Sequence, residues 1–184
     1  MCQNRITPLL QQILDYVSDY AAECDLPTWC RQGLVAGAAA WDVCCDCNEG
    51  SGQLWVRLVG WEPDPSFDQP LPNGCDQPTQ LVVGVGSLRC VPTLNEAGEP
   101  PSAAEEDDSA ALIQWDADVL RNAVMCQLEE RFWVSWQPLD NQGGCGGGEH
   151  LFRIPFYPCN CTEETDDSES PPNEGFAVGG VGWT

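Results

Sequence analysis

Cysteine is the residue whose abundance in this sequence most suggests chemistry, with 12 among 184 residues. Three stand within the stretch WDVCCDCNEG, where Cys44 and Cys47 have the CxxC spacing of zinc ligands. Cys45 interrupts that pair and no second CxxC completes a four-ligand set, so packed thiols with a few late disulfides are favoured over structural zinc. Seven cysteines fall near expected element ends (Cys24, Cys30, Cys44, Cys45, Cys47, Cys159, Cys161) and five stand alone (Cys2, Cys75, Cys90, Cys126, Cys145).

A catalytic cysteine would need a base, and His150 is the only histidine. Cys145 precedes it by five residues in a glycine-rich stretch, and that spacing does not establish hydrogen-bond reach. The stretch GGCGGGE also lacks the Lys-Ser/Thr of a phosphate-binding loop. We therefore expect His150 to be an ordinary residue at a strand start. We expect no catalytic, cofactor or metal site, and hence no enzyme.

Hydrophobic periodicity predicts the elements that position these residues. Apolar residues at helical spacing predict one helix over residues 8–24, with Thr7 as its N-cap, and a second over 109–131. Gly84 and Gly86 share one face of a strand and predict close approach of a helix or another backbone. The element order predicts an α+β fold with a largely antiparallel sheet and both helices on one face. The predicted strands are residues 33–41, 53–61, 80–91 and 149–157.

Composition divides the chain into two parts. Residues 1–161 form the expected α+β domain. Within it, 62–78 is a proline-rich loop, 95–108 an acidic loop and 138–148 a turn region. Residues 162–184 have the composition of an acidic linker followed by an apolar C-terminal arm. We expect the arm to dock on a neighbouring subunit or an adjoining ring, because its apolar residues are costly to leave in water.

The net charge of −22 comes from 29 acidic and seven basic residues. Such a chain repels phosphate backbones and anionic lipid, so a nucleic-acid reader is disfavoured. The N-terminus lacks the pattern of a secretory signal, and no stretch approaches the roughly 20 apolar residues that cross a bilayer. We expect a soluble protein made in a reducing cytoplasm.

Large apolar residues at loop edges and in the arm are typical anchors of protein interfaces. An assembly protein is therefore the first functional hypothesis. The candidate partner-contact residues are Trp61, Phe67, Trp136, Cys145, Phe176, Val178 and Trp183.

Four stretches of the chain resemble the tail terminator (neck) proteins of long-tailed phages of actinobacteria, which are gpU-like. The stretches are AAAWDVCCDCNEGSGQLWVRLVGWEP, LVVGVGSLRC, DADVLRNAVMCQL and WQPLDNQGGCGGGEHLFRI, and the similarity covers about residues 8–157. Two features depart from the family pattern: the third cysteine, Cys47, and the ending after Cys161. These departures affect neighbouring contacts and not the class.

The resemblance implies small α+β subunits in a hexameric ring that caps the tail tube and ends its polymerisation. The partners it implies are other copies of the chain, the major tail tube protein and the connector or stopper protein of the head. The location is the neck of the virion, assembled in the host cytoplasm. An acidic lumen would let DNA pass without specific binding. We expect the loops 62–78 and 141–148 to make contacts between rings, and Cys44 and Cys45 to end a strand and pack inward.

Two alternatives stay open beside the terminator. One is a head-to-tail connector or stopper, whose rings are also acidic and α+β. The other is a binding module stabilised by zinc or disulfides. An enzyme comes last.

Overall fold

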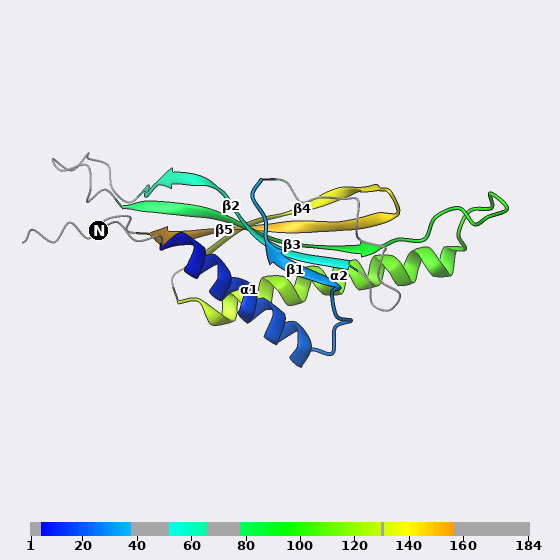
Figure 1. The fold of residues 1–184 in the computed structure, drawn as a ribbon, viewed down its shortest axis with the longest axis horizontal. Helices are drawn as coiled ribbons and strands as arrows, with labels where there is room; N and C mark the ends of the chain where they lie inside the picture. The colour runs from blue at the N-terminus through cyan, green and yellow to red at the C-terminus, as the bar shows by residue number, and fades with distance from the viewer. Residues whose placement is uncertain (1–4, 38–51, 66–77, 130, 157–184) are drawn as a thin grey trace, which may run out of the picture.

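The computed structural model describes residues 5–37, 52–65, 78–129 and 131–156. It contains two helices and a five-stranded mixed sheet, which confirms the predicted α+β class. Both helices cover one face of the sheet (Figure 1). The elements are α1 (Ile6–Glu23), β1 (Arg31–Leu34), β2 (Gly52–Pro63), β3 (Thr79–Cys90), α2 (Ala103–Gln127), β4 (Phe132–Gln142) and β5 (Cys145–Phe156).

The strand order across the sheet is β1-β2-β3-β5-β4. β1 pairs with β2 in parallel, and the other three pairings are antiparallel, as predicted for most of the sheet. The β2–β3 pairing has one irregularity in register and the β4–β5 pairing has two, whereas the β3–β5 pairing is continuous over 12 residues. The long central strands therefore form a rigid platform, and β1 and β4 are its edges.

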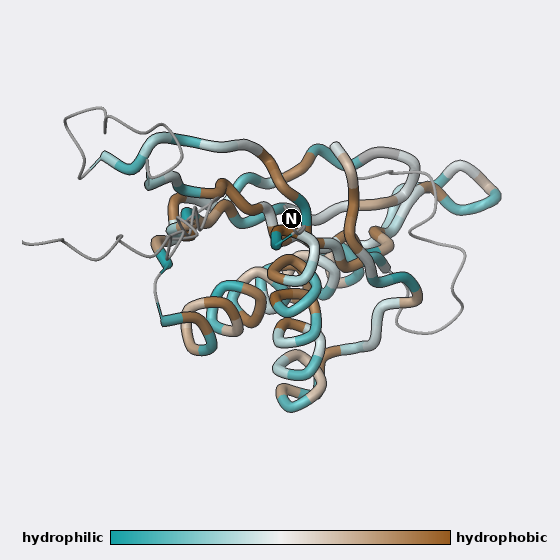
Figure 2. The backbone as a smooth tube through the Cα atoms, turned by 60° about the vertical axis from the view of Figure 1, so that its left-hand side comes forward, coloured by the Kyte–Doolittle hydropathy of each residue, from teal (hydrophilic) through white to brown (hydrophobic). Residues whose placement is uncertain are grey.

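The main core lies between the sheet and the two helices. Apolar and polar residues alternate within the turns of both helices, as expected for helices with one buried face, while apolar colour runs along parts of the strands (Figure 2). Each fully buried aliphatic side chain stabilises the fold by about 1.5–3 kcal/mol relative to leaving it in water. The residues of this core that are 0–2% exposed are Ile13, Val17, Ala21, Leu54, Val56, Leu81, Val83, Val85, Leu120, Ala123, Val124 and Phe152.

The helix boundaries differ from the prediction. α1 begins before the predicted N-cap Thr7, and Arg5 occupies the cap position without a side-chain hydrogen bond. α2 begins at Ala103, six residues before the predicted start, and ends at Gln127. Ser102 and Glu105 form a reciprocal capping box there. The expected acidic loop therefore contributes the first turns of a helix, where carboxylates are favourable.

β4 was not predicted. The predicted second helix ended at residue 131, the residues directly after it were assigned to no element, and Pro138 was assigned to a turn. Proline is tolerated here because β4 is an edge strand and needs no ladder donor on its outer side. β1 is confined to Arg31–Leu34, while residues 38–41 of the predicted strand lie outside the described residues.

The glycines act differently from the expectation. Only Gly143 and Gly144 form the hairpin turn, both with positive φ, while Gly146 to Gly148 belong to the buried part of β5. Gly84 and Gly86 do allow close approach, by side chains of neighbouring strands and, at Gly86, also by the backbone carbonyl of Gly148, but not by a helix. A Cβ at Gly84 would lie 2.4 Å from the Glu149 carboxylate, and one at Gly86 would lie 2.3 Å from the Trp55 ring.

Candidate functional site

Glu149 is the best-connected polar group on the sheet face away from the helices. It is 3% exposed and accepts hydrogen bonds from Trp55 Nε1 at 2.8 Å and from Arg57 Nε and Nη2 at 2.7 and 2.6 Å. The hydrogen bonds to Glu149 are the main cause that raises the pKa of Arg57, and burial opposes them. These three donors from β2 bind one carboxylate of β5, so the group holds β2 and β5 together.

Arg89 and Asp116 form a second buried ion pair on the helix side. Arg89 Nε and Nη2 lie 2.8 and 2.9 Å from the two oxygens of Asp116, and the side chains are 2% and 0% exposed. The guanidinium also lies 4.5 Å from the ring centroid of Trp29. This bidentate pair joins β3 to α2.

His150 lies inside β5 and not at a strand start, which corrects the prediction. Its Nε2 donates to the carbonyl of Ala117 in α2 at 2.6 Å, and its Nδ1 accepts from Trp133 Nε1 at 3.0 Å. A carbonyl only accepts and an indole N–H only donates, so the contacts define a neutral imidazole. Burial lowers the pKa of His150, and the nearby Arg121 lowers it further, against opposing effects of Ala117 and Asp118.

Cys145 and His150 do not come together. They are five residues apart in one strand whose pairing with β3 is continuous, so their side chains point to opposite faces of the sheet. Cys145 is 1% exposed and packs with Trp55 and Leu88, whereas His150 packs with Trp136 on the helix side. The two residues therefore cannot act as a nucleophile and its base.

Every basic residue of the chain is an arginine, and all seven lie in the described ranges. Arg57, Arg89 and Arg153 are held in ion pairs. Arg131 donates to the carbonyls of Met125 and Glu129. Arg5 and Arg121 lie over the rings of Phe156 and Trp133, and Arg31 is exposed at the start of β1. Positive charge is thus dispersed among internal contacts and forms no continuous track for phosphates.

Of the residues predicted to contact partners, Trp61 is 47% exposed and meets Phe156 edge to face, with ring centroids 5.6 Å apart. Trp136 is half-buried, and its ring covers Gly148. Cys145 is part of the core, so it offers no contact surface. Phe67, Phe176, Val178 and Trp183, together with the linker and arm, lie outside the described residues.

Sequence reasoning missed a group of exposed apolar residues where β4 begins. Phe132, Trp133 and Val134 are 60%, 41% and 36% exposed. Arg121 stacks on Trp133, with 5.1 Å between the guanidinium carbon and the ring centroid, and Arg131 adjoins Phe132 in the chain. We call these five residues the aromatic end. The run FWV, which directly follows the predicted end of the second helix at residue 131, was the available indication, but it was assigned to no strand.

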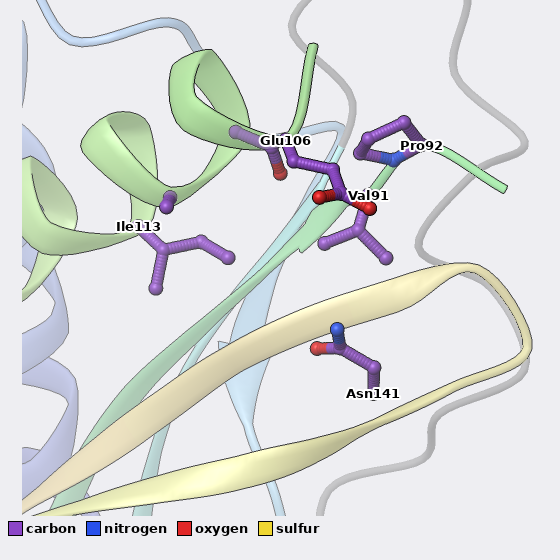
Figure 3. A pocket seen from close by; sticks show the side chains of 7 residues that line it. Val91, Pro92, Glu106, Ile113 and Asn141 are labelled. Carbon is purple, nitrogen blue, oxygen red and sulfur yellow. The ribbon is translucent and has the colours of Figure 1, made fainter. Parts of the chain in front are cut away.

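A hollow of about 230 Å³ lies at the opposite end of the sheet, between the first turns of α2, the end of β3 and the tip of the β4–β5 hairpin. The labelled side chains of Glu106 and Ile113 approach it from the helix, and Val91 and Asn141 approach it from the strands (Figure 3). It is below the roughly 300 Å³ at which small-molecule pockets begin. Its lining residues are Val91, Pro92, Glu106, Ser109, Ala110, Ile113 and Asn141.

The described cysteines include both disulfide-bonded and free side chains. Cys30, Cys90 and Cys145 are disulfide-bonded, whereas Cys24 and Cys126 are free, the first half-buried and the second exposed. The described ranges contain no group of three His, Cys, Asp or Glu side chains suited to a metal ion. Of the seven cysteines on which the zinc alternative depends, Cys24 is free and Cys30 is disulfide-bonded. The other five, Cys44, Cys45, Cys47, Cys159 and Cys161, lie outside those ranges.

No protein-family model matches the chain, and the curated proteins contain no significant relative. Among the described helices, none is long and apolar enough to cross a membrane. The fold and the surfaces thus define a small α+β protein with an apolar core, two internal ion pairs and exposed apolar groups at one end of its sheet.

Proposed function

We propose that the chain is a structural virion protein that forms a ring on the end of a phage tail tube, stops tube polymerisation and joins the tail to the head connector. The observation that carries the proposal is the aromatic end, an exposed apolar surface on a rigid α+β subunit of the class that the terminator resemblance implies. Exposed aromatic residues beside arginine are typical of interface centres.

The polar groups of the described sheet support an assembly role over a catalytic one. Glu149 and Asp116 are bound by arginines, and both ring nitrogens of His150 are engaged. A general acid or base needs a partner atom within reach of substrate, and these groups are hydrogen-bonded to internal partners. They stabilise the subunit.

The charge distribution supports passage of DNA through the ring. With seven arginines dispersed and a net charge of −22, the surface offers DNA no continuous phosphate contact. The proposed partners are further copies of the chain in a hexamer, the major tail tube protein and the head connector or stopper.

Polymerisation of the purified tail tube protein tests the proposal. With the chain added during assembly, we expect shorter tubes, each with a ring at one end in electron micrographs. Serum albumin of matched concentration is the control. Unchanged tube length with no bound ring would contradict the proposal. Binding to head connectors but not to tubes would instead assign the chain to the connector or stopper class.

A further inference from the structure

Three disulfide-bonded cysteines gather at one end of the sheet. Cys30 directly precedes β1, and its N–H donates to the carbonyl of Gly52, the first residue of β2, at 3.1 Å. Cys90 ends β3 and Cys145 begins β5, and the two are register partners. Gly52 in turn pairs with Arg89, the chain neighbour of Cys90, so all three cysteines lie close in the register of the sheet. At this end β3 stops and the β4–β5 hairpin turns (Figure 1).

The side chains at this end form a small core of their own. Cys145 packs with Trp55 and Leu88 on the sheet face away from the helices, and Cys90 packs against them. This cluster has three buried residues, whereas the main core between sheet and helices has eighteen among the described residues. We call Cys30 and these four residues the disulfide end. Burial of so few side chains contributes little compared with the main core, and disulfide bonds add the restraint that it lacks.

The free thiols of the described ranges lie in the helix layer. Cys24 is the C-cap of α1 and packs against the main core, and Cys126 lies in the last turn of α2. Oxidised and reduced cysteines are therefore separated by their place in the fold. A change of redox conditions can act on the disulfide end and leave the helix layer as it is.

We propose that the disulfide end is a redox-sensitive element. When it is oxidised, the ends of β1, β3 and β5 are fixed, and when it is reduced, they open while the main core stays folded. Trp55 is also bound by Glu149 at 2.8 Å, so the opening stops at the middle of the sheet. Thiols and disulfides of the glutathione class set its state. The inference does not depend on the terminator role.

The end opens by thiol–disulfide exchange. A glutathione thiolate attacks one sulfur of a protein disulfide, the S–S bond breaks, and a mixed disulfide and one protein thiolate result. A second glutathione thiolate attacks the mixed disulfide, which releases the other protein thiolate and forms oxidised glutathione. Each opened bond thus takes two electrons from two glutathione molecules, and the two protein thiolates take up the two protons that the glutathione thiols released.

Hydrogen exchange followed by mass spectrometry tests the inference on the full chain, equilibrated with oxidised or with reduced glutathione. Alkylation and peptide masses verify which cysteines are bonded in each sample. On reduction, we expect amide exchange to rise about tenfold in residues 31–34, 88–91 and 143–147, because local opening exposes their amides. Residues 10–21 of α1 and 116–124 of α2, which contribute to the main core, should keep their protection.

Two double variants sharpen the test. Cys90→Ser with Cys145→Ser removes the bonds of two strand ends and should exchange like the reduced chain even in oxidised glutathione. Cys24→Ser with Cys126→Ser is the matched control, because it removes the same number of sulfurs from the helix layer and keeps the bonded cysteines. This control should respond to reduction as the native chain does. If the strand-end variant does not fold, the comparison of oxidised and reduced native chain still decides.

Three outcomes would overturn the inference. The first is that Cys30, Cys90 and Cys145 stay thiols in oxidised glutathione. The second is that reduction leaves exchange at the disulfide end unchanged. The third is that reduction raises exchange equally in both helices, which would show that the bonds hold the whole domain and not one end. The tube assay tests the terminator role separately, so neither result depends on the other.

Discussion

The middle of the sheet and the two ends of the molecule use charge in opposite ways. In the middle, Arg89 with Asp116 and Arg57 with Glu149 are paired and buried or nearly so. At one end, residues 91–110 contain six exposed carboxylates and no basic residue, and at the other end the aromatic end exposes apolar side chains. The difference teaches that the fold neutralises charge where water is excluded and leaves it unbalanced where the surface is open.

Removal of Asp116 from its buried ion pair with Arg89 should have the largest effect on stability. Asp116→Ala leaves the guanidinium of Arg89 buried without its counter-charge, so we expect a loss of about 3–5 kcal/mol in the free energy of unfolding. Urea denaturation followed by tryptophan fluorescence measures this loss. Asp107→Ala, at an exposed position of the same helix, is the control and should change stability little. A loss below about 1 kcal/mol for Asp116→Ala would show that the pair contributes no more than a solvent-exposed ion pair does.

Overpacking beside the Glu149 network should have a smaller effect. Gly86→Ala places a Cβ 2.3 Å from the Trp55 ring, so we expect destabilisation of about 1–3 kcal/mol as the ring shifts. Gly33→Ala in β1 meets nothing within 4 Å and is the matched control. The same denaturation experiment compares them. Equal stability of the two variants would mean that the Trp55 side chain shifts without a loss of stability.

Acid should loosen the contact between β4 and α2. Because the pKa of His150 is lowered from 6.5 in the folded chain, the unfolded chain takes up more protons below that pH. Stability is therefore fully present above about pH 6.5 and falls as the pH drops from there toward the lowered pKa. Protonation would also turn Nδ1 into a donor facing the Trp133 N–H.

Denaturation midpoints across that pH range test the effect. His150→Gln should flatten the dependence between pH 6.5 and the lowered pKa, while carboxylate titrations at lower pH remain. If stability varies with pH in the His150→Gln variant as it does in the native chain, the pH dependence belongs to other titratable groups.

Substitution at the aromatic end should barely affect stability. Phe132→Ser, at a side chain 60% exposed, is expected to change the free energy of unfolding by less than about 0.5 kcal/mol. Thermal denaturation at a concentration where the chain is monomeric checks it. A large loss in the free energy of unfolding would place Phe132 in the core. The contrast between a buried, charge-paired middle of the sheet and an exposed aromatic end would then be wrong.

The last prediction is that the chain does not bind DNA. At low salt, where phosphate contacts are strongest, we expect no retardation of duplex DNA, because the arginines are dispersed in internal contacts. Tight binding that weakens with salt would contradict the proposed lumen.

The sequence alone determined the fold class, both helices and four of the five strands in outline, because helical and strand periodicities are local properties. It did not reveal β4, since FWVSWQPLDNQ contains a proline and polar residues that only an edge position tolerates. It also placed the start of α2 too late, because the carboxylates that stabilise a helix N-terminus have the composition of a loop.

Tertiary structure alone decided the sites. Arg57 and Glu149 are 92 residues apart, and Arg89 and Asp116 are 27 apart, so no local pattern predicts either pair. The spacing of Cys145 and His150 left a nucleophile and base open, and the alternation of one continuous strand put them on opposite faces. The separation between the aromatic end and the acidic residues 91–110 likewise depends on the direction in which α2 and β4 cross the sheet. Pairing in space depends on how elements pack, and packing is a property of the whole chain that short stretches of sequence do not carry.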